Sequence, residues 1–234
     1  MPPATTIVTL VGSRDECDGM RVFTFTRPEG YRFEPGQYRT ITLQTREGAV
    51  TKAFTHCDAP GDASSMVLTR MSGSAFKDAL GALEPGAKVE TAGPFGRLTV
   101  PAGARKAAFL VGGVGVTPAA SIVRDSVLRA TGLECLMFYG NRDASCIPLR
   151  ADFDEYEAAA PVHRVDVLST PDDSWTGERG YIDAALVRRH CDPLDGWHWF
   201  VSGPPLMTEA MRAVLQALAV PASAASYEQF TGYR

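Results

Sequence analysis

The sequence predicts two consecutive domains, a small antiparallel β-barrel followed by a parallel α/β sheet. In the first part of the chain, short runs rich in β-branched and aromatic residues are separated by Gly, Pro and Asp turn signals, which is typical of a small barrel. In the second part, apolar strand-like runs alternate with helix-like segments, which indicates a parallel sheet covered on both faces. The pattern changes at Pro101-Ala102-Gly103-Ala104, so we expect one domain over residues 1–103 and another over residues 104–234.

The barrel strands are expected where β-branched and aromatic residues cluster. Those runs cover residues 7–11, 20–25, 38–43, 66–69 and 88–92. One helix is expected to interrupt them over residues 74–83. Ser74 is a favoured capping residue at its start, and Pro85-Gly86 ends it.

The α/β domain is expected to bind its ligands at one edge of the sheet. The predicted strands cover residues 107–111, 135–139, 162–168 and 199–202, and the helices that follow them cover residues 119–130, 150–158, 183–190 and 206–218. Parallel sheets of this kind bind ligands outside the carboxyl ends of their strands. The loops that leave these strands are therefore where we expect the site.

A glycine-rich turn, Gly112-Gly113-Val114-Gly115-Val116-Thr117-Pro118, joins the first of these strands to its helix. Glycine lets the backbone approach a ligand closely and adopt unusual φ values. The helix start offers unpaired N–H groups and the positive end of the helix dipole. This turn is therefore suited to hold a pyrophosphate, although an ordinary tight connection has the same pattern.

Composition and charge exclude several classes of protein. The 234 residues are 45% hydrophobic and 21% charged, as in a folded globule. No apolar run approaches the ~20 residues that span a bilayer, and the first residues lack the regions of a signal peptide. We therefore expect a cytoplasmic protein without membrane insertion. The formal net charge is −4 and neither domain is basic overall, so nucleic acid is not an expected partner.

The cysteines and histidines do not form a metal-binding pattern. The five cysteines are widely spaced and include no Cys-x-x-Cys pair, which argues against structural zinc and against a four-cysteine iron–sulfur centre. We expect them to be free thiols in a reducing compartment. No histidine has metal-ligand spacing to another histidine or to a cysteine, and His56 is expected in an exposed turn. No metal site is predicted. The cysteines are Cys17, Cys57, Cys135, Cys146 and Cys191.

Eight short motifs occur in order along nearly the whole chain. They are Pro35-Gly36-Gln37-Tyr38, Lys52-Ala53-Phe54-Thr55, Gly73-Ser74, Gly93-Pro94-Phe95-Gly96, Gly112–Pro118, Tyr139-Gly140-Asn141-Arg142, Gly203-Pro204-Pro205-Leu206-Met207 and Tyr227-Glu228-Gln229-Phe230. Each motif is loose, but the ordered set resembles the ferredoxin–NADP reductase superfamily. The resemblance implies an FAD-binding β-barrel followed by an NAD(P)-binding domain, in a compact bacterial-type reductase. No cysteine follows Cys191 to supply the C-terminal iron–sulfur cluster of related electron-transfer subunits.

The flavin signature of this superfamily is an Arg-x-Tyr-Ser/Thr stretch, and the matching positions are Lys52, Phe54 and Thr55. The resemblance implies that Lys52 contacts flavin phosphate, that Phe54 packs on the ring or ribityl chain, and that Thr55 hydrogen-bonds near flavin N5. Lysine lacks the bidentate fork of arginine, and phenylalanine lacks the tyrosine hydroxyl. Flavin is therefore expected to be held less tightly than is usual. The alternative is an ordinary strand with one solvated lysine.

The resemblance also assigns positions that meet the phosphates of the two cofactors. It places Gly73 and Ser74 at the flavin pyrophosphate, and it places Gly113, Gly115 and Thr117 at the nicotinamide nucleotide. Ser74 and Thr117 suit helix capping equally well.

The loop after the second strand of the α/β domain is expected to bind the adenosine ribose. Arg142 would receive the 2′-phosphate of NADPH, whereas the neighbouring Asp143 would receive the free ribose diol of NADH. The two side chains also suit an ion pair with each other, so the choice between NADPH and NADH stays open.

The last strand and the tail complete the implied site. Ser202 stands where the superfamily often has a cysteine near nicotinamide C4, and Gly203, Pro204 and Met207 are assigned to cofactor binding. A glutamate near the end of related reductases approaches the flavin, and an aromatic residue covers its ring. Glu228 with Phe230 or Tyr233 suits these roles. Thr55, Ser202 and Glu228 are therefore the predicted catalytic residues.

The predicted function is hydride transfer from NADPH or NADH to FAD, followed by single-electron transfer to a protein acceptor. The implied acceptors are a ferredoxin, a flavodoxin or an oxygenase component. Two alternatives stay open: an NAD(P)H:flavin reductase that uses free flavin as its substrate, and a non-catalytic electron-transfer or regulatory subunit of a larger complex.

Overall fold

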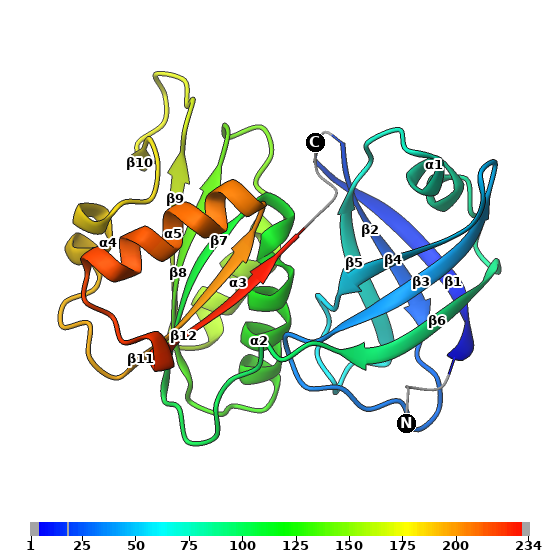
Figure 1. Ribbon diagram of the computed structural model, residues 1–234, viewed down its shortest axis with the longest axis horizontal. Helices are drawn as coiled ribbons and strands as arrows, with labels where there is room; N and C mark the ends of the chain where they lie inside the picture. Colours follow the sequence, from blue (N-terminus) through cyan, green and yellow to red (C-terminus); the bar gives the residue numbers. More distant parts are fainter. Residues whose placement is uncertain (1–4, 18, 231–234) are drawn as a thin grey trace.

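Two lobes lie side by side in the computed structural model, which describes residues 5–17 and 19–230 (Figure 1). One lobe is an antiparallel barrel, and the other is a parallel sheet with helices on both faces. The predicted two-domain class is confirmed. The boundary expected after residue 103 falls in the connection between the last barrel strand and the first strand of the parallel sheet. No helix in the described part of the chain has the length and apolar character needed to cross a membrane.

The barrel is a six-stranded antiparallel sheet with the order β4-β3-β6-β1-β2-β5. Its strands are β1 (Thr5–Cys17), β2 (Met20–Thr26), β3 (Tyr38–Thr45), β4 (Gly48–Thr55), β5 (Ser64–Arg70) and β6 (Lys88–Phe95). Alternate side chains point inward, as pleated strands require, and residues such as Phe25 and Ile41 form the barrel core. The edge strands β4 and β5 are linked by an isolated bridge between His56 and Val67. A seam therefore runs between β4 and β5.

Strand β4 is absent from the strands that the sequence predicts. Most of its side chains are exposed, and only Phe54 and Thr55 at its end are buried. It therefore lacks the apolar–polar alternation by which a half-buried strand is recognised. Its position is fixed by pairing with β3, in a register that runs from Tyr38 opposite Thr55 to Thr45 opposite Gly48.

The parallel sheet has the order β10-β9-β8-β7-β11-β12. Its strands are β7 (Lys106–Gly112), β8 (Glu134–Asn141), β9 (Val162–Leu168), β10 (Glu178–Arg179), β11 (Trp197–Gly203) and β12 (Ala225–Gln229). The helices are α1 (Ala75–Gly81) in the barrel lobe, then α2 (Thr117–Leu128), α3 (Arg150–Ala159), α4 (Ala184–His190) and α5 (Pro205–Ala217), with short 3-10 turns η1 (Gly113–Val116) and η2 (Ala222–Ala224).

Neighbouring residues of β7 face opposite layers of the sheet. Phe109 packs in the core that includes α2 and α3, whereas Leu110 packs in the core that includes α4 and α5. Both side chains are fully buried, which explains why β7 reads as a continuous apolar run. Figure 1 shows α4 and α5 on the near face and α2 with α3 on the far face.

The expectation of five free thiols is wrong. Cys17 at the end of β1 and Cys146 in the loop after β8 form a disulfide with an S–S distance of 2.02 Å, across 129 positions of sequence. Cys57, Cys135 and Cys191 are free and buried. Beside the disulfide, the Glu16 carboxylate accepts a hydrogen bond from the Leu149 N–H at 3.0 Å. The end of β1 is thus tied to the second domain by a covalent bond and a hydrogen bond.

His56 is buried, so its predicted place in an exposed turn is also wrong. Its ring stacks on Phe33 at 3.9 Å between centroids, and its nitrogens lie 3.1 Å from both the Tyr31 hydroxyl and the Asp58 carboxylate. Burial lowers the pKa of His56. Asp58 is bound by the Arg27 guanidinium at 2.5 Å, and its backbone carbonyl accepts from Ser121 of α2 at 2.7 Å. This cluster braces the barrel against the second domain.

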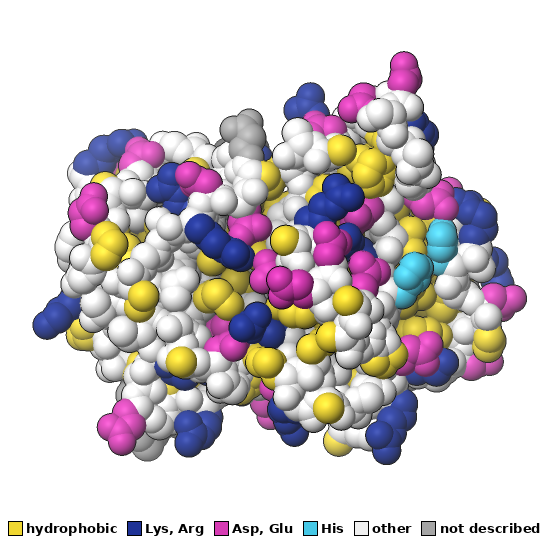
Figure 2. All heavy atoms as spheres, turned by 180° about the vertical axis from the view of Figure 1, so that it is seen from behind, with side chains coloured by type: hydrophobic (Ala, Val, Ile, Leu, Met, Phe, Trp, Pro, Cys, Tyr) yellow, Lys and Arg dark blue, Asp and Glu magenta, His cyan; other side chains and the backbone are white. Residues whose placement is uncertain are grey.

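The face opposite to that of Figure 1 carries charged side chains of both signs on both lobes (Figure 2). Both signs are spread over this face, and several acidic groups lie near its middle.

Candidate functional site

The glycine turn between β7 and α2 uses two of its glycines in different ways. Gly113 has φ +51°, and a Cβ placed on it would meet no atom within 4 Å. Gly115 instead packs against β11, where an added Cβ would overlap the backbone carbonyl of Ser202. Gly113 therefore leaves open space beside the turn, and Gly115 permits close packing between the turn and the sheet.

A cavity of about 510 Å³ opens beside this turn, at the carboxyl ends of β7, β8, β9 and β11. Four predicted cofactor-binding residues line it: Gly113, Arg142, Pro204 and Met207. The barrel contributes Met20 and Arg70 to the same wall. The cavity is therefore built by both domains, at the edge where parallel sheets bind their ligands.

Arg142 and its neighbour Asp143 are only loosely associated. The Arg142 side chain is 85% exposed, and its Nε lies 3.9 Å from the Asp143 carboxylate. Asp143 instead accepts hydrogen bonds from the backbone N–H and the hydroxyl of Ser145, which lower the pKa of its carboxyl group. Tyr181, which is 81% exposed, lies at the same cavity. The Arg142 guanidinium is thus free to bind an anion.

Ser202 and Glu228 are neighbours on β11 and β12. The two residues are register partners in the parallel pair, and neither lines the cavity. The Ser202 hydroxyl donates to the Gly115 carbonyl at 2.6 Å and is fully buried. Burial raises the pKa of Glu228 to about 7, and its Oε2 has no hydrogen-bond partner within the described residues. Ser202 therefore anchors the glycine turn, while Glu228 is a carboxyl group whose pKa lies near neutral pH.

The other predicted residues of the second domain lie beside the cavity without lining it. The Thr117 hydroxyl is buried and donates to the Val114 carbonyl at 3.1 Å. Gly203 packs against Met207, and its carbonyl accepts from the Phe230 N–H at 2.9 Å. These contacts hold the turn, α5 and the chain end together. Tyr233 lies outside the described residues.

The predicted flavin residues gather at the seam between β4 and β5. Lys52 is exposed on β4, whereas Phe54 and Thr55 are buried. The Phe54 ring stacks on Phe76 of α1 at 5.7 Å, and the Nζ of Lys77 lies 4.5 Å from the centre of the Phe54 ring. A flavin ring that stacks on Phe54 would therefore contact a side chain that already packs against Phe76 and Lys77 of α1. The role of Phe54 in flavin stacking stays a prediction.

Gly73 and Ser74 lie at the start of α1. Gly73 has φ +70°, with open space where a Cβ would stand. Ser74 caps the helix by accepting a hydrogen bond from the Lys77 N–H at 3.4 Å. The capping role is present in the structure, and phosphate contact stays a prediction.

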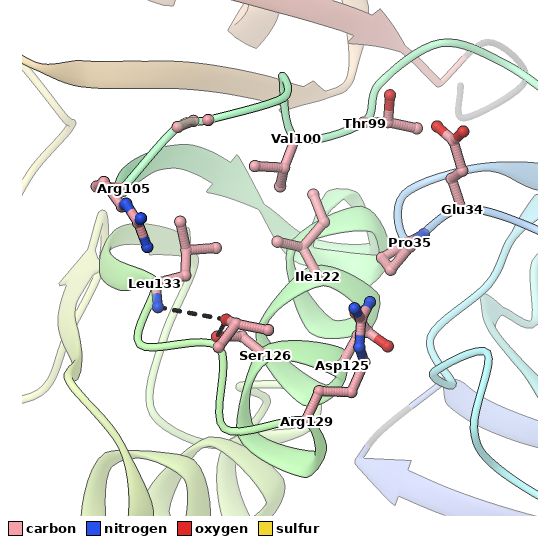
Figure 3. Close-up of a pocket in the computed structure, with 13 residues that line it drawn as sticks. Glu34, Pro35, Thr99, Val100, Arg105, Ile122, Asp125, Ser126, Arg129 and Leu133 are labelled. Carbon is pink, nitrogen blue, oxygen red and sulfur yellow. Dashed lines mark hydrogen bonds and ion pairs between the residues drawn. The ribbon is translucent and has the colours of Figure 1, made fainter.

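A second cavity, of about 460 Å³, lies at the opposite edge of the parallel sheet (Figure 3). Its wall combines Glu34 of the barrel lobe with Arg105, with Asp125 of α2, and with Arg129 at the C-cap of α2. Asp125 and Arg129 form an ion pair at 3.2 Å. None of the predicted site residues lines this cavity, which sits by the amino ends of β7 and β8. It is a gap at the domain junction rather than the cofactor site.

Sequence reasoning singles out Arg70 without deciding its role, and it misses two further residues that the structure brings to these sites. Met20 and Arg70 line the cofactor cavity from the barrel, and Lys77 lies over Phe54. In the sequence, Arg70 stands out only as an extra charge upstream of Gly73, and an exposed strand position explains it equally well. No sequence pattern marks Met20 or Lys77, because their positions depend on how the lobes and α1 are packed.

Comparison with known proteins agrees with this architecture. Residues 109–213 match the family model of the oxidoreductase NAD-binding domain. Ferredoxin–NADP reductase B of Sorangium cellulosum is 28% identical over 235 residues, which cover 94% of this chain and 96% of that protein. The nitrate reductase [NADPH] of Aspergillus niger is 27% identical over 237 residues, which cover 90% of this chain but only 27% of that much longer protein.

Two solved structures share the whole fold. The FAD/NAD-binding domain of a nitric oxide dioxygenase from Vibrio cholerae has a TM-score of 0.87 at 16% identity, covering 98% of this chain and 99% of that one. A ferredoxin–NADP⁺ reductase from Neisseria gonorrhoeae with bound FAD and NADP has a TM-score of 0.83 at 14% identity, covering 96% and 98%. These likenesses define a two-domain nucleotide-binding oxidoreductase fold. The chain is therefore similar to a ferredoxin–NADP reductase over nearly its whole length, and residues 109–213 carry an oxidoreductase NAD-binding domain.

Proposed function

We propose that this protein transfers a hydride from NAD(P)H to FAD and passes single electrons to a protein acceptor. The observation that carries the proposal is the cavity beside Gly113, which both domains build. A nicotinamide nucleotide bound along the glycine turn would extend toward the barrel residues Met20 and Arg70. The two reacting rings must meet at such a junction, because hydride transfer requires direct contact.

The residues at the β4–β5 seam fit a flavin dinucleotide. Lys52 and Lys77 carry positive charge there, and within the described residues neither has a carboxylate partner at ion-pair distance. An uncompensated pair of cations suits the negative charge of a pyrophosphate. Bound flavin would supply a two-electron acceptor that releases electrons singly. Thr55, buried at the end of β4, would orient the ring near N5.

Glu228 and Ser202 serve this chemistry in different ways. With a pKa of about 7, Glu228 would hold or release a proton at the working pH. Ser202 would act through its hydrogen bond to Gly115, which sets the position of the glycine turn. Ser202 is then a positioning residue, and Glu228 is the candidate for proton management.

NADPH is the coenzyme that the cavity favours. Arg142 is exposed and only loosely held by Asp143, whose carboxylate is engaged by Ser145. A free guanidinium suits the 2′-phosphate of NADPH, whereas Asp143 already accepts two hydrogen bonds on Oδ1 and has only Oδ2 left for the ribose diol of NADH.

A ferredoxin is the favoured acceptor, because a relative that matches this chain over nearly the whole length of both proteins bears the name ferredoxin–NADP reductase. A flavodoxin or an oxygenase component is the alternative acceptor. A second function, reduction of free flavin as substrate, is favoured by one observation: Phe54 packs against both Phe76 and Lys77 and is little exposed for ring stacking.

Flavin content and turnover of the purified protein test the proposal. We expect about one FAD per chain and faster oxidation of NADPH than of NADH. We also expect electron delivery to a ferredoxin, measured by the reduction of cytochrome c. A colourless protein that turns over added flavin would favour the free-flavin reductase. Failure to oxidise either nucleotide with ferricyanide as acceptor would contradict both enzymes and support a non-catalytic subunit.

A further inference from the structure

The Lys77 side chain crosses the seam of the barrel. It extends from α1 to hydrogen-bond the Thr69 hydroxyl on β5, and its Nζ lies 4.5 Å from the ring centre of Phe54 on β4. The ring of Phe76 is 5.9 Å away. The ammonium group therefore sits between the two edge strands, directly over the aromatic residue of the flavin signature.

This ammonium group is largely buried without a compensating anion among the described residues. Asp78, its neighbour on α1, is bound by Arg46 of the β3–β4 turn at 3.0 Å. Lys52, on β4, is close enough to oppose the charge of Lys77. Burial, and then the positive charge of Lys52, lower the pKa of Lys77 to about 8. A cation held beside a second cation and away from water is costly unless an anion joins them.

Hydrogen-bond capacity leads to the same conclusion. An ammonium group has three donors, and Thr69 accepts one of them. The faces of Phe54 and Phe76 offer weak cation–π attraction but no lone pair. Two strong donors of Lys77 are therefore left for a ligand that brings several acceptor oxygens.

We propose that Lys77 is a second phosphate-binding cation at the flavin site, and that it acts with Lys52 on the pyrophosphate of FAD. The inference rests on the proposed function, because it takes flavin as the ligand of the seam. Lys52 alone is a point charge where arginine would bind in bidentate fashion. A second ammonium group from α1 restores two charge-assisted contacts to the phosphates.

Riboflavin has the same ring as FAD but lacks the pyrophosphate and the adenosine. Comparing the two ligands therefore separates phosphate binding by Lys77 from ring packing. Apoprotein is titrated with FAD and with riboflavin, following flavin fluorescence, for wild type, Lys77→Met, Lys77→Arg and the control Lys88→Met. Lys88 is an exposed barrel lysine on β6, away from the seam. We expect Lys77→Met to raise the Kd for FAD about 10- to 100-fold and the Kd for riboflavin less than about twofold. Lys77→Arg should restore most of the FAD affinity, and Lys88→Met should bind both ligands like wild type.

Each other outcome overturns the inference in a recognisable way. Equal losses for FAD and riboflavin would assign Lys77 to ring packing, and unchanged FAD affinity would leave it a structural residue. A folded wild-type protein that binds neither ligand would instead contradict the proposed flavin function itself. Circular dichroism of each variant shows whether the barrel is folded, and Lys77→Arg serves as the folded comparison if Lys77→Met is not.

Discussion

The Ser202 hydroxyl donates to the Gly115 carbonyl at 2.6 Å, and the Ser202 carbonyl occupies the space where a Gly115 side chain would begin. This double contact locks the glycine turn against β11. The turn therefore holds its shape through contacts within the protein, and the open space stays on the side of Gly113.

Alanine at Gly115 should mainly lower stability, whereas alanine at Gly113 should mainly weaken nucleotide binding. Gly115→Ala should destabilise the protein by about 1–3 kcal/mol, because backbone atoms of β11 cannot yield to the new methyl group. Gly113→Ala should cost only about 1 kcal/mol, from its left-handed φ, but should raise KM for the nucleotide by narrowing the cavity. Thermal denaturation and steady-state kinetics check this. A large loss of stability in Gly113→Ala with unchanged KM would contradict it.

Removal of the Arg142 guanidinium should weaken the binding of NADPH but not that of NADH. Arg142→Ala should raise KM for NADPH about 10- to 100-fold, the effect of losing hydrogen bonds to a charged phosphate. KM for NADH should change little, since NADH has no 2′-phosphate, and this coenzyme serves as the internal control. Equal losses with both coenzymes would show that Arg142 supports the loop rather than the phosphate.

Loss of the Cys17–Cys146 disulfide should lower stability without unfolding the barrel. A disulfide that closes a loop across 129 positions lowers the conformational entropy of the unfolded chain. The chain-entropy model assigns about 5 kcal/mol of stabilisation to a loop of this length. We expect a lower Tm for the double variant Cys17→Ser, Cys146→Ser, and a matching drop for wild type in dithiothreitol. The double variant itself should not respond to dithiothreitol. A response of the same size in both proteins would assign the effect to another group.

The order of elements and the class of fold are predictable because local patterns carry them. Alternating strands and helices after residue 104, and the glycine turn that begins at Gly112, are visible in the sequence itself. Strand β4 is not, because its exposed side chains show no alternation and its place is fixed by β3. Strand β12 is equally hidden, because its five residues form no continuous apolar run, although it pairs with β11 over its whole length.

The candidate site is predictable in its residues more than in their roles. Gly113, Arg142, Pro204 and Met207 line one cavity, since each follows or lies near the end of a sheet strand, and their binding of a cofactor stays a prediction. Ser202 cannot be recognised as an anchor from the sequence, because its partner Gly115 lies 87 positions away. The Cys17–Cys146 pair and the burial of His56 depend likewise on contacts between distant segments.

The buried carboxyl group of Glu228 should make stability fall as the pH rises. Its pKa is raised from 4.5 to about 7 by burial, so the folded state favours the protonated form. The stabilising effect of that proton is complete below pH 4.5 and is lost as the pH rises through about 7. Above that pH the ionised carboxylate remains, and its Oε2 has no hydrogen-bond partner among residues 5–17 and 19–230. Glu228→Gln, which mimics the protonated acid, should match the Tm of wild type at pH 4.5 and exceed it at pH 8. A Tm difference between the two proteins that stays constant over this range would show that folding does not raise the pKa of Glu228.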